Sequence, residues 1–160
     1  MKPSNILVIL TILCMCCFLC LAKSSPKEYV DAHNKARAEV GVPPLKWNDT
    51  VAAYTRNFVK TKIDTCVMEP SGGPYGENFA TFTYNSVNAN EVVDKWLEEK
   101  KEYNYSANSC TLGLYCGNYK QIVWRDTVHL GCAKTKCNNG WYFFACNYDP
   151  PANLKGGRPY

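Results

Sequence analysis

The stretch from Cys116 to Pro150 reads CGNYKQIVWRDTVHLGCAKTKCNNGWYFFACNYDP, and it decides the fold. Two runs rich in β-branched and aromatic residues, 128–137 and 141–148, flank an Asn-Asn-Gly turn. Because an Asn-Gly pair supplies the positive φ angles of tight hairpin turns, the two runs are predicted to form an antiparallel pair. With a three-residue turn, Cys132 faces Cys146, where a disulfide is geometrically feasible. A one-residue slip of the register would change that pairing.

The length of the chain favours a single domain. Its 160 residues, 46% of them apolar, suffice for one domain with a buried core. Residues 1–22 combine a positive start at Lys2, an apolar run and small residues at the end, which is typical of a secretory signal peptide. The alternative is a short membrane anchor, since the run approaches the roughly 20 residues that span a bilayer. No stop-transfer charges follow, so residues 23–160 are predicted to form one secreted domain.

Cysteine usage and charge narrow the class of protein further. Removal of the leader leaves six cysteines, and an even set in a secreted domain predicts three disulfides whose pairing the spacing alone leaves open. Without Lys2, 17 of the 18 basic residues remain against 14 acidic ones, a net charge of +3. No dense basic run exists, so no nucleic-acid partner is expected. Two glycosylation sequons, at Asn48 and Asn104, fit a secretory route.

Apolar residues recur at helical spacing in three segments, which predicts helices over about 26–40, 49–62 and 89–101. Ser25 and Glu28 form a capping-box pattern at the start of the first helix. The composition of 78–84 suggests an extended segment or a short strand, and the alternation in 119–125 predicts a strand. Residues 104–117 have little periodicity and two cysteines, which is typical of a disulfide-tethered loop.

Two side chains on the predicted helices need a partner. His33 lies on or beside the apolar face of the first helix, and we interpret it as a hydrogen-bonded core histidine rather than a chemical group. Glu99 continues an apolar stripe through Val92 and Trp96, so we expect it to be paired or functional, whereas Glu98 is expected to face solvent.

Several separated motifs occur in the order of one known family: AHNKAR at 32–37, PLKWN at 44–48, YGENFA at 75–80, Trp96 with Glu99, GNYKQIVWRDT, LGCAKTKCNNGWYFFACNYDP and a terminal RPY. On these motifs the chain resembles the plant pathogenesis-related class 1 proteins of the CAP superfamily (cysteine-rich secretory proteins, antigen 5, pathogenesis-related). The resemblance covers nearly all of the chain after the leader. It implies an α+β fold, a three-layer α-β-α sandwich stabilised by disulfides, and a monomeric defence protein secreted to the apoplast.

The resemblance, together with the hairpin register, favours the pairs Cys66–Cys137, Cys110–Cys116 and Cys132–Cys146.

CAP proteins carry two His and two Glu in a central cleft that can bind a divalent metal. The motifs place the two Glu at Glu77 and Glu99, but the His positions fall at Asn118 and at about Glu69 or Pro70. Zinc prefers nitrogen and sulfur ligands, so this degenerate cleft would suit only a weakly bound harder cation such as calcium or magnesium. Structural use of the two Glu in hydrogen bonds to the backbone is the favoured interpretation, and no cofactor is expected.

The sequence favours a binding protein over an enzyme. A Ser or Cys nucleophile needs a nearby base, and the motifs offer none; a degenerate metal-dependent hydrolase is the remaining enzymatic alternative. By resemblance to the stretch that the family uses for sterols, lipid binding is predicted at Tyr103, Tyr105, Leu112, Leu114 and Tyr115. The alternative is that these side chains pack beneath the loop. A glycan on Asn104 would lie within this region and block it.

These features predict an antifungal plant defence protein that binds sterol or another lipid, with a pathogen membrane as a further partner. The alternative is a precursor that a protease cuts between Asp149 and Pro150, because the related plant proteins release a defence-signalling peptide at this junction. The tail, 150–160, holds three Pro and two Gly and is expected to be irregular and on the surface. Ala152 replaces the family's Gly, which would slow such a protease. Otherwise the tail packs beside Trp47 or the hairpin.

Overall fold

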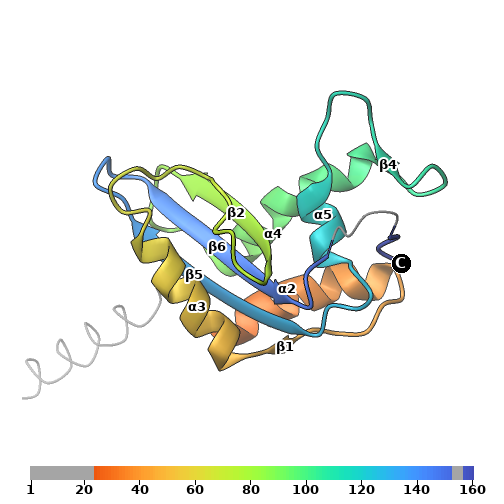
Figure 1. Cartoon of the computed structure of the whole chain (residues 1–160), viewed down its shortest axis with the longest axis horizontal. Helices are drawn as coiled ribbons and strands as arrows, with labels where there is room; N and C mark the ends of the chain where they lie inside the picture. Colours follow the sequence, from red (N-terminus) through yellow and green to blue (C-terminus); the bar gives the residue numbers. More distant parts are fainter. Residues whose placement is uncertain (1–23, 153–156) are drawn as a thin grey trace, which may run out of the picture.

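The computed structural model describes residues 24–152 and 157–160 (Figure 1). The predicted signal peptide therefore lies outside the described residues. A mixed sheet in the order β1-β5-β6-β2 forms the centre of the fold, with β1 parallel to β5 and the other two pairs antiparallel. The four strands are β1 (Lys46–Trp47), β2 (Gly76–Phe82), β5 (His129–Lys136) and β6 (Tyr142–Asp149). The strands expected at 78–84, 128–137 and 141–148 are confirmed, as β2, β5 and β6.

The β5–β6 hairpin has the predicted register. Cys132 lies opposite Cys146, and the Cys137 N–H donates to the Trp141 carbonyl oxygen at 2.8 Å. Gly140 adopts a φ of 88°, in the left-handed region that glycine enters at little steric cost. The three disulfides that the resemblance implied are all present, as Cys66–Cys137, Cys110–Cys116 and Cys132–Cys146.

Helices cover both faces of the sheet and complete the three-layer α-β-α sandwich (Figure 1). On one face, α3 (Asp49–Lys60) contributes Val59 to a cluster with Phe143 and Ala145 of β6. A β carbon on Gly131 of β5 would collide with the α3 backbone, so glycine is what lets this helix lie so close to the sheet.

The opposite face of the sheet carries α2 (Pro26–Glu39) and α4 (Ala89–Leu97). Trp96 of α4 and Tyr148 of β6 belong to the larger apolar cluster that these helices cover. Since neighbouring residues on a strand point to opposite faces, successive β6 side chains belong to the two clusters in turn. Six consecutive β6 residues, 143–148, are buried for this reason.

The predicted helix starts are confirmed by their caps. Ser25 and Glu28 form the expected capping box of α2, and Asn48 accepts hydrogen bonds from the first turn of α3. The third helix is shorter than predicted, because the α-helical part ends at Leu97 and the chain continues to Glu102 as the 3-10 helix η1 (Glu98–Glu102).

One predicted strand is wrong. Residues 119–125 do not extend a sheet: 117–122 form the helix α5 (Gly117–Ile122), which packs beside η1 and β2. The Glu99 carboxylate accepts from the backbone N–H groups of Asn118 at 2.8 Å and Tyr119 at 3.2 Å. A carboxylate at a helix N-terminus satisfies free N–H groups and complements the helix dipole. A contact from a distant segment thus overrides the strand-like alternation of the local sequence.

Arg37 of α2 secures the other end of α5. Its buried guanidinium donates to five carbonyl oxygens, two of them at 2.8 Å, and these belong to Pro43, Ile122, Trp124, Arg125 and Thr127. Burial lowers the pKa of Arg37 to about 10. In the described part of the chain no helix is both long and apolar enough to cross a membrane.

Candidate functional site

Glu99, one of the two Glu in the predicted cleft, accepts hydrogen bonds from groups of α5. Besides the two N–H bonds that cap the helix, its Oε1 accepts from the Asn118 side-chain amide at 2.6 Å. Burial raises the pKa of the Glu99 carboxyl, and the hydrogen bonds from Asn118 and Tyr119 oppose that shift. The expectation of a paired Glu99 is confirmed, and Glu98 is exposed as predicted.

Glu77 is held by a different set of groups. Its Oε2 accepts from the Ser71 N–H at 2.9 Å, and its Oε1 accepts from the Ser71 hydroxyl and, at 3.2 Å, from the Asn147 amide. Ser71 in turn contacts the Tyr54 hydroxyl of α3 at 2.8 Å. Glu77 therefore belongs to the α3 side of the sheet, where its carboxylate ties the 69–76 loop to β6.

The remaining predicted cleft residue lies elsewhere. The exposed Glu69 is 3.8 Å from the Lys62 ammonium, near the end of α3. Of the four residues in the predicted degenerate cleft, only Glu99 and Asn118 are bonded to each other. Within residues 24–152 and 157–160, no cluster of three or more His, Cys, Asp or Glu side chains has the arrangement of a metal site.

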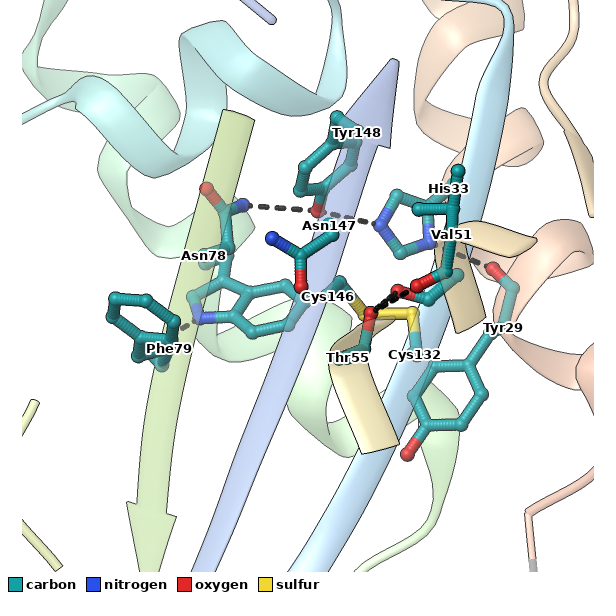
Figure 2. The surroundings of a disulfide bond; sticks show 12 residues. Tyr29, His33, Val51, Thr55, Asn78, Phe79, Cys132, Cys146, Asn147 and Tyr148 are labelled. Carbon is teal, nitrogen blue, oxygen red and sulfur yellow. Dashed lines mark hydrogen bonds between the residues drawn. A yellow bond between two sulfur atoms is a disulfide. The ribbon is translucent and has the colours of Figure 1, made fainter. Parts of the chain in front are cut away.

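A buried polar network crosses the sheet face that carries α2 (Figure 2). The Tyr148 hydroxyl lies 2.9 Å from Nε2 of His33 and accepts from the Asn78 amide at 3.1 Å. His33 Nδ1 is 2.7 Å from the Tyr29 carbonyl oxygen. Complete burial lowers the His33 pKa to about 4, so the ring is neutral at physiological pH. The structural interpretation of His33 is confirmed.

Two buried amides connect α5 to other segments. Asn78 also donates to the Asn118 carbonyl oxygen at 3.1 Å, which links β2 to α5. Gln121 of α5 accepts from the Ala152 N–H at 3.1 Å. Three buried amide atoms have no hydrogen-bond partner among the described residues: Asn78 Oδ1, Asn147 Oδ1 and Gln121 Nε2. Internal waters would satisfy these three atoms, which do not all lie on the same face of the sheet.

The predicted lipid-binding residues lie on one loop. We call residues 103–116 the apolar loop: it contains the short strands β3 (Tyr103–Asn104) and β4 (Ser109–Cys110) and is closed by Cys110–Cys116. Leu112 is fully exposed, and Leu114 and Tyr115 are 53% and 66% exposed. These three side chains do not pack beneath the loop, so that alternative is wrong for them.

The two tyrosines at the start of the apolar loop are in a different situation. The Tyr105 ring stacks on Tyr160 at a centroid distance of 4.9 Å and an interplanar angle of 12°. Tyr103 is half-buried against Tyr119 and Tyr160. These rings therefore form the base of the loop, while Leu112, Leu114 and Tyr115 form its exposed tip.

The C-terminal residues 157–160 bind the apolar loop through hydrogen bonds and a ring stack, contacts that we call the grip of the tail. Arg158 donates to the carbonyl oxygens of Tyr105 and Ser106, and the buried Pro159 accepts from the Arg125 N–H at 2.7 Å. The described tail is irregular, as predicted. It packs against the apolar loop and α5, however, and not beside Trp47 or the hairpin. The Tyr160 ring stacks on Tyr105 of the loop, and its hydroxyl lies 3.2 Å from the Tyr119 hydroxyl of α5.

The predicted cleavage point lies where β6 ends. The Asp149 carbonyl oxygen accepts from the Val128 N–H at 2.9 Å, and that of Pro150 accepts from the Thr127 hydroxyl at 2.9 Å. Both sides of the junction are thus hydrogen-bonded to the segment before β5. Release of a peptide here remains a prediction, and it would require these bonds and the grip of residues 157–160 to break.

Comparison with known proteins identifies the family. A sequence model of the cysteine-rich secretory protein family, CAP, matches residues 30–148. The chain belongs to the CAP family. It is 47% identical over 141 residues to pathogenesis-related protein 1A of Nicotiana tabacum, covering 88% of this chain and 84% of that protein. It is 44% identical over 158 residues to pathogenesis-related protein 1 of Arabidopsis thaliana, covering 98% and 96%.

The fold comparison agrees with the sequence comparison. Venom allergen-like protein 4 of Schistosoma mansoni, a solved structure, is 29% identical to this chain and superposes with a TM-score of 0.66. The match covers 86% of this CAP chain and 95% of that protein. The resemblance inferred from separated motifs is confirmed.

Sequence reasoning missed two contributors to this CAP domain. The sequence marks Arg37 only as part of the AHNKAR motif, although its five acceptors make it the junction of α2, α5 and the chain before β5. Tyr160 is marked only as the end of the RPY motif. A lone Arg on an apolar helix face was the available signal for the first, since a buried Arg must find several acceptors. The role of Tyr160 depends on a contact that no local pattern encodes.

Proposed function

We propose that this chain is a secreted plant defence protein whose apolar loop binds a sterol or a related lipid. The names of its relatives, pathogenesis-related protein 1 of several plants, support the defence role. The observation that carries the binding role is the exposure of Leu112, Leu114 and Tyr115 on one disulfide-closed loop.

The tip of the apolar loop has the chemistry that a sterol needs. When a lipid covers the exposed leucines, their apolar surface is removed from water. This burial contributes a favourable free energy of roughly 25 cal/mol per Å². Tyr115 adds a polar group at the edge. Most of its side chain is exposed, but its hydroxyl end lies against Gly117, where burial and the nearby negative charge of Glu99 raise the pKa of the hydroxyl, so it stays protonated. A protonated hydroxyl can donate to the single hydroxyl of a sterol.

Closure by Cys110–Cys116 limits what binding must order. The two cysteines are 6 positions apart, and Gly113 adopts a φ of 79° in the turn between them. A loop that is already closed loses less conformational freedom on binding than an open one. Binding without catalysis also fits the separate hydrogen bonding of Glu77 and Glu99, which leaves neither carboxylate aimed at the other.

The test is a titration of the secreted form, residues 23–160, with a fluorescent sterol. All the described helices, strands and disulfides lie within this form. The double variant Leu112→Ser/Leu114→Ser should weaken binding at least about tenfold, since each leucine contributes on the order of 1.5 kcal/mol when buried. The matched control is Val67→Ser/Met68→Ser, which removes two exposed apolar side chains from another loop. Equal affinity of wild type and the Leu112/Leu114 variant would overturn the proposal.

The glycosylation site on the same loop gives an independent check. Asn104 is exposed, and its Oδ1 accepts from the Ala107 N–H at 3.0 Å, which leaves the amide nitrogen to carry a glycan. If the sequon is used, sterol affinity should rise in Asn104→Gln from a plant host. The same substitution should have no effect on protein from a bacterial host.

A further inference from the structure

A second concave region lies away from the apolar loop, where α2 begins. It is a cavity of about 530 Å³, within the usual range for small-molecule sites. Its lining comes from α2, β1, α3, β5 and the turn after β2, and consists of Ser24, Pro26, Tyr29, Trp47, Arg56, Asn85, Cys132, Ala133 and Lys134. None of these residues belongs to the apolar loop or to the predicted cleft.

The topology of the sheet explains why a cavity forms there. β1 pairs only with His129 and Leu130 of β5. Beyond these two residues, on the side away from β6, β5 has no neighbouring strand among the described residues. Three consecutive residues, 132–134, reach the cavity from this open edge although their side chains alternate between the two faces.

The walls of the cavity are largely apolar. Tyr29 and Trp47 contribute aromatic surface, and the Cys132–Cys146 disulfide lies next to Tyr29 (Figure 2). Burial raises the pKa of the Tyr29 hydroxyl to about 12, so this group remains a neutral donor. An apolar ligand body is compatible with these walls.

The charged groups of the lining are all cations. Lys134 lies over the rings of Phe144 at 5.5 Å and Tyr142 at 5.9 Å, and its one hydrogen bond among the described residues is a long one, 3.5 Å, to Asn85. Arg56 is exposed on α3. The ion pairs of the described residues involve neither Arg56 nor Lys134.

Two acids near the lining in sequence are engaged elsewhere. The Glu28 carboxylate accepts from the Ser25 backbone N–H at 2.6 Å as part of the capping box. Asp49 accepts from the Trp47 indole N–H at 3.0 Å. The described lining therefore combines apolar walls with two cations and no carboxylate, which is the complement of a ligand with an apolar body and a negative head group.

We propose that this cavity binds an amphiphile that carries one anionic head group. The head group, a carboxylate or a phosphate, is held by Arg56 and Lys134, and the apolar body lies against Tyr29, Trp47 and the disulfide. An arginine fork suits either head group, because both present paired oxygens. This site is separate from the one under the proposed function, so either can fail without the other.

Calorimetric titration of the secreted form, residues 23–160, tests the charge preference. Decanoate and decyl phosphate should bind, whereas decanol should bind at least about tenfold more weakly, as expected when charge-assisted hydrogen bonds are lost. Decylammonium should not bind. The tighter of the two anions identifies the head group. No binding of either anion, or equal binding of decanoate and decylammonium, would overturn the proposal.

Variants locate the site. Arg56→Gln/Lys134→Gln should weaken both anions at least about tenfold and leave decanol binding unchanged. Lys136→Gln is the matched control, because Lys136 also lies on β5 and over the Tyr142 ring but does not line the cavity. Leu112→Ser/Leu114→Ser should bind decanoate like wild type. Unchanged anion affinity in a folded Arg56/Lys134 variant would contradict the proposal.

Fluorescence quenching gives a second readout of position. A decanoate with a terminal bromine should quench the tryptophan fluorescence, and Trp47→Phe should remove most of that quenching, although three other tryptophans remain. Quenching that survives Trp47→Phe would place the probe outside this cavity.

Discussion

The β5–β6 hairpin and the apolar loop each contain a disulfide, but their surroundings are opposite. In the first, Cys132–Cys146 joins strands whose residues are covered on both faces by helices. In the second, Cys110–Cys116 closes a loop with Leu112 fully exposed at its tip. The same local device thus holds a buried core in one place and presents apolar side chains to solvent in the other.

The difference shows what each region needs from a covalent link. The β5–β6 hairpin is also stabilised by ladder hydrogen bonds and burial, so its disulfide adds to an ordered structure. The apolar loop buries little, and its order depends on the short disulfide and on the contacts of Arg158 and Tyr160. Exposed apolar side chains on a weakly packed loop remain accessible to a ligand.

The largest expected effect is on the free energy of unfolding. It should differ between the long-range disulfide at the end of the β5–β6 hairpin and the short-range disulfide of the apolar loop. The Cys66–Cys137 pair spans 71 residues and Cys110–Cys116 spans 6. By the chain-entropy relation, Cys66→Ala/Cys137→Ala should cost roughly 4 kcal/mol and Cys110→Ala/Cys116→Ala roughly 2 kcal/mol. Urea denaturation measures both. Equal losses would show that the loop is as integral to folding as the sheet.

A somewhat smaller change in the free energy of unfolding should come from the titration of His33 in the buried polar network. The pKa of His33 is about 4 in the folded protein and 6.5 for an unperturbed histidine. Between these values the unfolded chain binds a proton that the folded chain does not. The His33 contribution to the free energy of unfolding therefore falls as the pH drops from 6.5 to 4, by about 3 kcal/mol in total.

The readout is the difference in pH slope between wild type and His33→Gln, measured by urea denaturation from about pH 7 to about pH 4. Gln can still bond to the Tyr148 hydroxyl but does not titrate, so the variant should lose stability less steeply on acidification. His129→Gln is the control, because the only other histidine is partly exposed on β5. Identical slopes in wild type and His33→Gln would disprove the assignment.

The smallest expected effect concerns the grip of the tail on the apolar loop. Arg158→Ala/Tyr160→Ala removes the ring stack and two hydrogen bonds to the loop. Global stability should fall by only about 1 kcal/mol, since these contacts are at the surface. Amide hydrogen exchange should nevertheless become faster across 103–116 and stay unchanged in β5 and β6. Arg125→Ala, which keeps the backbone donor to Pro159, should leave exchange in both regions as in wild type.

Local sequence determined the parts of this protein whose stabilising groups are close together along the chain. The hairpin followed from an Asn-Gly turn between two β-rich runs, and the start of α2 followed from Ser25 and Glu28, three positions apart. The exposed apolar tip also had a local signal, in leucines between two cysteines 6 positions apart. Motif order supplied the family and the disulfide pairing.

Only the tertiary structure decided the conformation of α5 and the placement of the candidate cleft residues. The alternation in 119–125 favours a strand, yet Glu99 satisfies the first N–H groups of the helix, and Arg37 donates to the Ile122 carbonyl oxygen from 85 positions away. Because side chains alternate between the faces of β2 and β6, Glu77 points to the α3 side. Glu99 lies in η1, which packs beside α5. Such choices depend on which distant donor meets which acceptor in the folded chain, and a local window of sequence does not contain that information.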